Sequence, residues 1–219
     1  MKKSNLIFKI GMLSAITLLI SSCASLSTMQ TARVVEKGEI VTTIGGGTVK
    51  TDIPIGTLDT MNLKMPLMEI GARYALGNNF DIGAKITLIG TAVVDGKYQF
   101  LGDNKSFLAG SIGLGLGYFS VKSGESKSEF YDIMVPTYFS VHPIKWVSIY
   151  TSPKYIMRIN SFSNGKTTGN GTSHWYGGTV GLKLGNKTGF LIEYSYFKQS
   201  QLKTPFTQIT AGICFSPGN

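Results

Sequence analysis

Segments of alternating apolar and polar residues, separated by clusters of Gly, Asn, Asp, Ser and Pro, recur along the chain from Gly38 onward. Alternation with a period of two places successive side chains on opposite faces of a strand, and the clusters between segments are typical of turns. The segments are about ten residues long, the length of a strand that crosses a membrane. The predicted strands are 39–50, 67–76, 80–89, 94–101, 106–121, 129–141, 145–159, 173–185, 189–198 and 206–215.

The connections between these strands alternate in length. Tight turns at 77–79, 102–105, 142–145 and 186–188 are interspersed with mostly longer, more polar connections at 51–66, 90–93, 122–128, 160–172 and 199–205. Short turns at one end, long loops at the other and an even number of strands are typical of outer-membrane barrels. We therefore expect an all-β fold, an antiparallel transmembrane β-barrel of about ten strands, with 51–66 and 160–172 as its main contact surfaces.

One face of each predicted strand is apolar and carries no charge, as in Ile82, Ala84, Ile86 and Leu88. A charge exposed to hydrocarbon costs several kcal/mol, so this face is expected to contact lipid. The opposite face is expected to line the lumen and to hold a network of charges. Its members are Glu69, Arg73, Asp81, Lys85, Lys97, Asp132, Lys154, Arg158, Lys183 and Glu193.

Aromatic residues of the apolar face fall near the strand ends, as expected for girdles at the two membrane interfaces. Pro136 and Pro153 lie inside predicted strands, and because proline lacks an N–H we expect either a bulge at each or a different strand boundary there. The two predicted girdles are Phe80, Phe100, Phe139, Phe190 and Phe215 near the tight turns, and Tyr118, Tyr131, Tyr155, Tyr176 and Tyr196 near the longer loops.

The N-terminus has the features of a secretory signal, with three lysines before a short apolar core at 10–20. Ile20-Ser21-Ser22-Cys23 resembles the lipobox of bacterial lipoproteins, which implies cleavage after residue 22 and a lipid on Cys23. The alternative is an ordinary signal peptide followed by an unrelated cysteine. The expected organisation is a signal peptide at 1–22, a lipidated N-terminus and tether at 23–37, and a barrel at 38–219. Cys214 is expected to pack as an apolar residue, unless it pairs with Cys23.

The stretch 70–117, with IGARYALGNNFDIGAKITLIG and GKYQFLGDNKSFLAGSIGLGLG, is similar to small bacterial outer-membrane β-barrels, and the likeness extends over 39–215. The final QITAGICF resembles the strand that the barrel-assembly machinery recognises, although four residues follow Phe215. The resemblance implies an outer-membrane location with a periplasmic N-terminus. It also implies membrane lipid, the barrel-assembly machinery and the lipoprotein-processing machinery as partners; the oligomeric state is left open.

No motif identifies a catalytic, metal or cofactor site, and we expect no enzyme activity and no cofactor. Gly165-Lys166-Thr167 lacks the first glycine of a phosphate loop. His142 and His174 are expected at opposite ends of the barrel, which excludes a shared metal. A lipid or peptide hydrolase using His174 with a nearby serine remains an alternative. Positive charges are dispersed rather than clustered on one face, which argues against nucleic-acid binding.

The predicted lumen holds more cations than anions, which allows two interpretations. A barrel of about ten strands has little interior beyond its side chains, so an ion-paired plug is favoured over a narrow conduit for anions or small solutes. The predicted function is a lipid-anchored outer-membrane barrel with a structural or surface-interaction role. A further alternative is a soluble, lipid-anchored periplasmic barrel or sandwich that binds a ligand.

Overall fold

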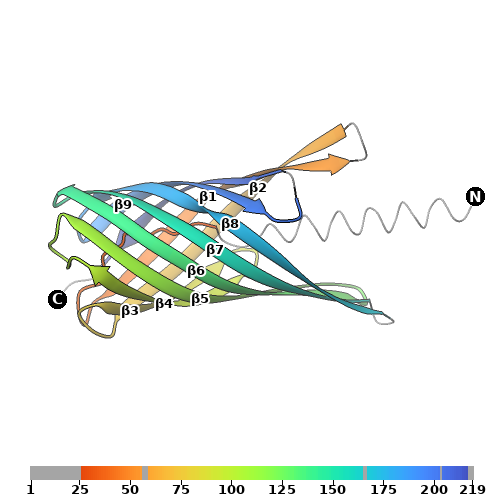
Figure 1. The fold of residues 1–219 in the computed structure, drawn as a ribbon, viewed down its shortest axis with the longest axis horizontal. Helices are drawn as coiled ribbons and strands as arrows, with labels where there is room; N and C mark the ends of the chain where they lie inside the picture. The colour runs from red at the N-terminus through yellow and green to blue at the C-terminus, as the bar shows by residue number, and fades with distance from the viewer. Residues whose placement is uncertain (1–25, 56–58, 165–166, 203, 217–219) are drawn as a thin grey trace, which may run out of the picture.

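The computed structural model describes residues 26–55, 59–164, 167–202 and 204–216, which include a closed antiparallel barrel (Figure 1). Each strand pairs with its neighbours in the chain, and β1 pairs with β10 to close the ring. The predicted ten-stranded barrel is therefore confirmed. Its strands are β1 (Ile40–Ile55), β2 (Asp59–Ala75), β3 (Phe80–Thr87), β4 (Ala92–Leu101), β5 (Leu108–Ser123), β6 (Ser126–Ile144), β7 (Val147–Ser163), β8 (Thr168–Gly185), β9 (Thr188–Gln199) and β10 (Phe206–Phe215).

The predicted long loops at 51–66, 122–128 and 160–172 are wrong, because strands occupy most of these residues. Thr51 pairs with Leu63, and Ser163 pairs with Thr168, so the strands continue almost to the tips of their hairpins. These hairpins extend beyond the body of the barrel at one end, here called the hairpin end (Figure 1). The opposite end, where short turns join β2 to β3 and β8 to β9, is the turn end.

Pro136 and Pro153 interrupt hydrogen bonding without shifting the register, so the predicted bulges are wrong. The β6–β7 ladder pairs Pro136 with Lys154 and Phe139 with Thr151, and the two intervening positions are skipped. The register is the same on both sides of this gap. Shifts occur instead near the turn end, between Gln99 and Leu101 and between Val141 and Ile144. Each proline is therefore accommodated by missing bonds rather than by an extra residue.

The outer surface of the barrel is apolar. Ile70, Leu114 and Ile192 are exposed near mid-strand, as the alternation predicts for a lipid-facing surface. All ten aromatic residues assigned to the two girdles are exposed as well. A barrel in water would bury such residues. Across the described ranges, no helix is both long and apolar enough to cross a membrane.

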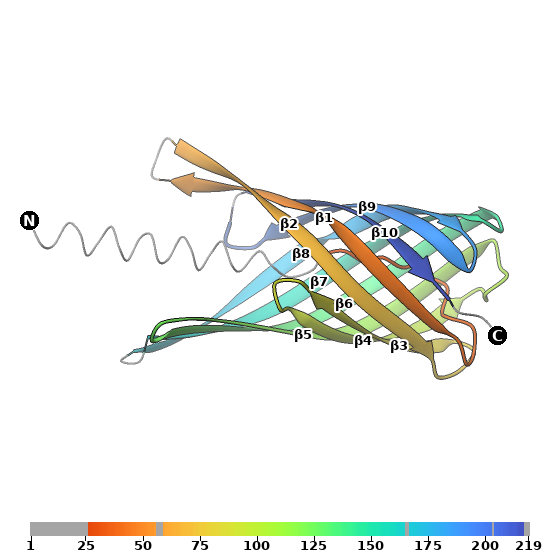
Figure 2. The ribbon, with the colours of Figure 1, turned by 180° about the vertical axis from the view of Figure 1, so that it is seen from behind.

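Residues 26–37 are here called the N-terminal segment; residues 26–35 lie inside the barrel, and Glu36 and Lys37 are exposed where the segment leaves it (Figure 2). The predicted signal peptide and Cys23 lie outside the described residues. The expectation of a tether at 23–37 is corrected for its described part, since Leu26 and Ala32 are fully buried. The segment runs towards the turn end, where Arg33 donates a hydrogen bond to the Ser106 carbonyl in the β4–β5 turn. The N-terminal segment lies inside the barrel because its apolar side chains are buried there, which a solvated polar linker would not require.

Candidate functional site

The lumen side chains form the candidate site, and their main partner is the backbone of the N-terminal segment. Glu193 on β9 accepts hydrogen bonds from the backbone N–H groups of Thr28, at 2.9 Å, and Met29, at 2.5 Å. Asp81 on β3 accepts another from the N–H of Val35, at 3.0 Å. Extended chain inside a barrel cannot pair with a neighbouring strand, so its polar groups need such partners.

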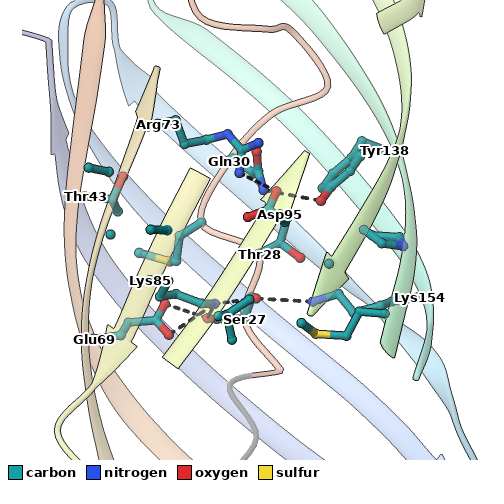
Figure 3. A pocket seen from close by; sticks show the side chains of 18 residues that line it. Ser27, Thr28, Gln30, Thr43, Glu69, Arg73, Lys85, Asp95, Tyr138 and Lys154 are labelled. Atoms are coloured by element: carbon teal, nitrogen blue, oxygen red, sulfur yellow. Dashed lines mark hydrogen bonds and ion pairs between the residues drawn. The ribbon is translucent and has the colours of Figure 1, made fainter. Parts of the chain in front are cut away.

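Lysines of the barrel wall satisfy the carbonyl groups of the same segment. Lys97 on β4 donates to the carbonyls of Thr31 and Arg33 at 3.1 and 2.9 Å. Lys154 on β7 donates to the carbonyls of Leu26 and Ser27 at 3.1 and 3.3 Å. Figure 3 shows Lys154 and Lys85 reaching Ser27 from opposite walls. Lys85, Lys97 and Lys154 therefore act mainly as hydrogen-bond donors to the backbone of the N-terminal segment.

Neutral side chains complete the contacts between the N-terminal segment and the wall. Gln99 on β4 accepts from the N–H of Val34 at 2.9 Å, and Ser140 on β6 accepts from the N–H of Ala32 at 3.2 Å. Ser111 on β5 donates to the Ala32 carbonyl. Glu69 on β2 accepts a hydrogen bond from the Ser27 hydroxyl, and Thr179 on β8 donates one to the Leu26 carbonyl. Every strand from β2 to β9 therefore contributes a polar contact to the N-terminal segment.

The two remaining strands contact the N-terminal segment through glycine. Gly45 on β1 lies directly opposite Gly212 on β10, and the Met29 side chain fills the space beside them. A Cβ added at Gly212 would come within 2.3 Å of the Met29 methyl group. The glycine pair thus lets the segment lie against the seam where the barrel closes.

Ion pairs join the wall strands in two groups. In the first, Arg73 contacts Asp81 at 2.6 Å and Asp95 at 2.7 Å, and Lys97 lies 3.5 Å from Asp81. Glu69 and Lys85 are 3.5 Å apart beside this group. In the second, Arg158 on β7 and Asp132 on β6 form a two-pronged contact at 2.7 and 2.8 Å. Buried charges of this kind require such pairing.

The predicted lumen residues all lie on the inner face, but the structure does not bring them into one network. Lys154 and Glu193 form hydrogen bonds with the N-terminal segment, whereas Arg158 and Asp132 form an ion pair with each other. Lys183 lies at the turn end and has no ion pair in the described chain. Asp95 was missed, although it has the same strand parity as Lys97. The N-terminal segment was also missed, and its buried Leu26, Met29, Ala32, Val34 and Val35 were the available signal.

Little space remains beside the first described residues of the N-terminal segment. A cavity of about 70 Å³ adjoins Ser27, Arg73, Lys85, Asp95 and Lys154 (Figure 3). That is room for about two water molecules. This space can hold ordered water beside the peptide backbone, but no solute of substrate size.

The two histidines have local partners. His142 at the end of β6 is hydrogen-bonded to Ser140 at 2.9 Å and Ser148 at 2.7 Å. His174 on the exterior of β8 is bonded to the Tyr155 hydroxyl at 2.7 Å, rather than to a serine. Among the described residues, no three His, Cys, Asp or Glu side chains are grouped to hold a metal. Cys214 is buried with Met29 and Leu191, as an apolar residue packs.

Comparison with known proteins supports the fold. The sequence matches no family model and no curated protein. The outer-membrane protease OmpT of Escherichia coli is 12% identical, with a TM-score of 0.54 over 88% of this chain and 100% of its own. Neisserial surface protein A is 13% identical, with a TM-score of 0.42 over 80% of this chain and 96% of its own. Ail of Yersinia pestis is 14% identical, with a TM-score of 0.39 over 81% of this chain and 99% of its own. The chain thus has the fold of small outer-membrane β-barrels, and these identities show the fold alone.

Proposed function

We propose that this protein is an integral outer-membrane barrel with a structural or surface-interaction role, closed to solutes by its own N-terminal segment. The observation that carries the proposal is the polar contact of that segment with side chains from β2 to β9. The hairpin end is proposed to face outward and the turn end to face the periplasm, because outer-membrane barrels place their short turns inside.

Membrane residence rests on the apolar exterior with its aromatic rims. A lysine at Ile70, near the middle of this surface, is expected to cost about 2–4 kcal/mol if the residue faces lipid. The same substitution on a water-exposed surface changes stability by about 0.5 kcal/mol or less. Urea unfolding in lipid vesicles distinguishes the two, with Asn62→Lys on the exposed β2 hairpin as the matched control. A folded monomer in detergent-free buffer would instead support the soluble alternative.

Closure of the lumen rests on how its cations are used. Lys85, Lys97 and Lys154 each donate to the N-terminal segment, so they are not free to attract passing anions. We expect the unmodified protein to be silent in planar bilayers. Removal of residues 26–35 is expected to produce conductance, with insertion and folding verified by a heat-dependent gel shift. A steady anion-selective current through the unmodified chain would instead establish the conduit interpretation.

The surface role is assigned to the paired hairpins at the hairpin end. Protease added to intact cells is expected to cut β5–β6 or β7–β8 near their tips, and complete protection would argue against surface exposure. Acylation of Cys23 remains a prediction, which the mass of the N-terminal peptide tests. The absence of catalysis also remains a prediction. We expect neither the unmodified protein nor His174→Ala to hydrolyse envelope lipids or peptides.

A further inference from the structure

A second cavity, of about 200 Å³, lies at the turn end, apart from the small space beside Ser27. Side chains from separate parts of the chain line it: Arg33 from the N-terminal segment, Lys145 from the β6–β7 turn, Lys183 from β8 and Lys187 from the β8–β9 turn. Arg73 and Lys97 line it as well, and both are paired with Asp81. The proposed closure of the lumen gives no reason for the other four cations to meet there.

The charges around this cavity do not balance. Its lining contains two acidic residues, Glu36 and Glu39. Glu39 is already engaged, because it lies 3.7 Å from the Lys187 ammonium and accepts a hydrogen bond from Ser216 at 3.0 Å. In the described chain, Lys145 and Lys183 form no ion pair within 4.0 Å. Like charges that share a concave space are stabilised when an anion joins them.

Arg33 adds an unused hydrogen-bond donor. Its Nη2 donates to the Ser106 carbonyl, while its Nε atom is buried without a hydrogen-bond partner. Burying such a donor unpaired costs about 1–3 kcal/mol, so these atoms are normally satisfied. Asp103 in the neighbouring turn acts on Arg33 electrostatically, but its carboxylate is occupied by Lys105 and Ser106. Arg33 therefore adds to the lining of the cavity a positive charge that has no ion pair in the described chain, while its Nε atom is enclosed by protein.

The inner wall of the cavity is apolar. Val41, Leu191 and Cys214 line it, and the Lys183 stem lies beside Cys214 next to Gly189. His142, also in the lining, has both ring nitrogens bonded to serines. The wall can thus take a short hydrocarbon portion while the cations hold an anionic group.

We propose that this cavity binds a small oxyanion ligand, a carboxylate or a phosphate, that enters from the turn end. Lys183 supplies the main counter-charge, Arg33 adds a second positive charge to the lining, and Lys145 stands at the entrance. The site rests on the position of Arg33 within the N-terminal segment, but it goes beyond the proposed closure of the lumen. It also gives Lys183 a role that the wall ion pairs do not provide.

The test is calorimetric titration of the intact protein, folded in a neutral detergent, with inorganic phosphate and separately with butyrate. At least one probe is expected to bind saturably at one site. Lys183→Gln should weaken that binding about tenfold to a hundredfold, the effect of losing one charge-assisted hydrogen bond. Lys198→Gln, which removes the same charge from the hairpin end of β9, should leave binding unchanged.

The two probes separate the ligand classes, because phosphate binding alone indicates a phosphate ligand and butyrate binding alone indicates a carboxylate. Arg33→Gln removes a second positive charge from the lining, and it should also weaken binding. A heat-dependent gel shift shows that each variant is folded. Absence of saturable binding by either probe, or equal binding by Lys183→Gln and the unmodified protein, overturns the proposal. Lys183→Gln should remain silent in bilayers, so failure here is distinct from failure of lumen closure.

Discussion

Replacing Glu193 with glutamine should loosen the N-terminal segment without emptying the space that the side chain fills. The carboxylate is 2% exposed and accepts the N–H groups of Thr28 and Met29, as well as the Tyr150 hydroxyl at 2.8 Å. An amide of the same shape keeps one acceptor oxygen and places an NH₂ group where the other stood. At least one charge-assisted bond is therefore lost, and such a bond contributes about 1.5–3 kcal/mol.

This loss corresponds to about a 10- to 150-fold increase in the equilibrium constant for opening of the N-terminal segment. Hydrogen exchange measured by mass spectrometry on peptides covering 26–37 should show protection reduced by that factor, while peptides from β6 and β7 keep theirs. Glu129→Gln is the matched control, because Glu129 bonds to Tyr118 and Lys127 on the exterior. Unchanged protection of 26–37 in Glu193→Gln would refute the assignment of Glu193 as its anchor.

Three further substitutions test the packing and charge of the lumen. Gly212→Val places a Cβ 2.3 Å from the Met29 methyl and 2.5 Å from the Ile44 carbonyl oxygen of the paired strand, so it should destabilise the fold by about 1–3 kcal/mol, measured as the midpoint of the heat-dependent gel shift. Gly171→Ala, in open space, should have little effect. Asp132→Asn leaves Arg158 buried without its carboxylate and should lower stability to urea by about 3–5 kcal/mol, whereas an equal midpoint would show that the pair is dispensable. Lys97→Met removes the donor to the carbonyls of Thr31 and Arg33, so hydrogen exchange should become faster in the turn-end half of the N-terminal segment. A uniform increase across 26–37 would contradict this local role.

The strand pattern was readable from sequence because lipid imposes a strict rule on one face. Charges are absent from the outward positions of the belt, so parity alone places Glu69, Asp81 and Lys97 inside. The same rule gave ten strands and both aromatic girdles. It fails beyond the membrane, where polar residues such as those of 160–172 can pair as strands or remain loops.

The occupant of the lumen was not readable in the same way. Parity shows which side chains point inward but not what they contact, and the wall residues could equally have paired with one another. Leu26, Met29 and Val34 lie in a short, irregular segment with no periodicity, so its burial depends on a matching surface built from distant strands. The Gly45–Gly212 pair is one part of that surface, and its register appears only in the closed ring.

The direction of the N-terminal segment bears on where a lipid on Cys23 could be inserted. Its first described carbonyl, that of Leu26, bonds to Thr179, about six residues from the turn end of β8, or roughly 15 Å in depth for a strand tilted by about 40°. Three residues of extended chain span at most about 11 Å. If Cys23 carries a lipid, as the lipobox predicts, at most about 11 Å of chain would join that lipid to a carbonyl held inside the barrel. Anchoring of the lipid and closure of the lumen would then constrain each other.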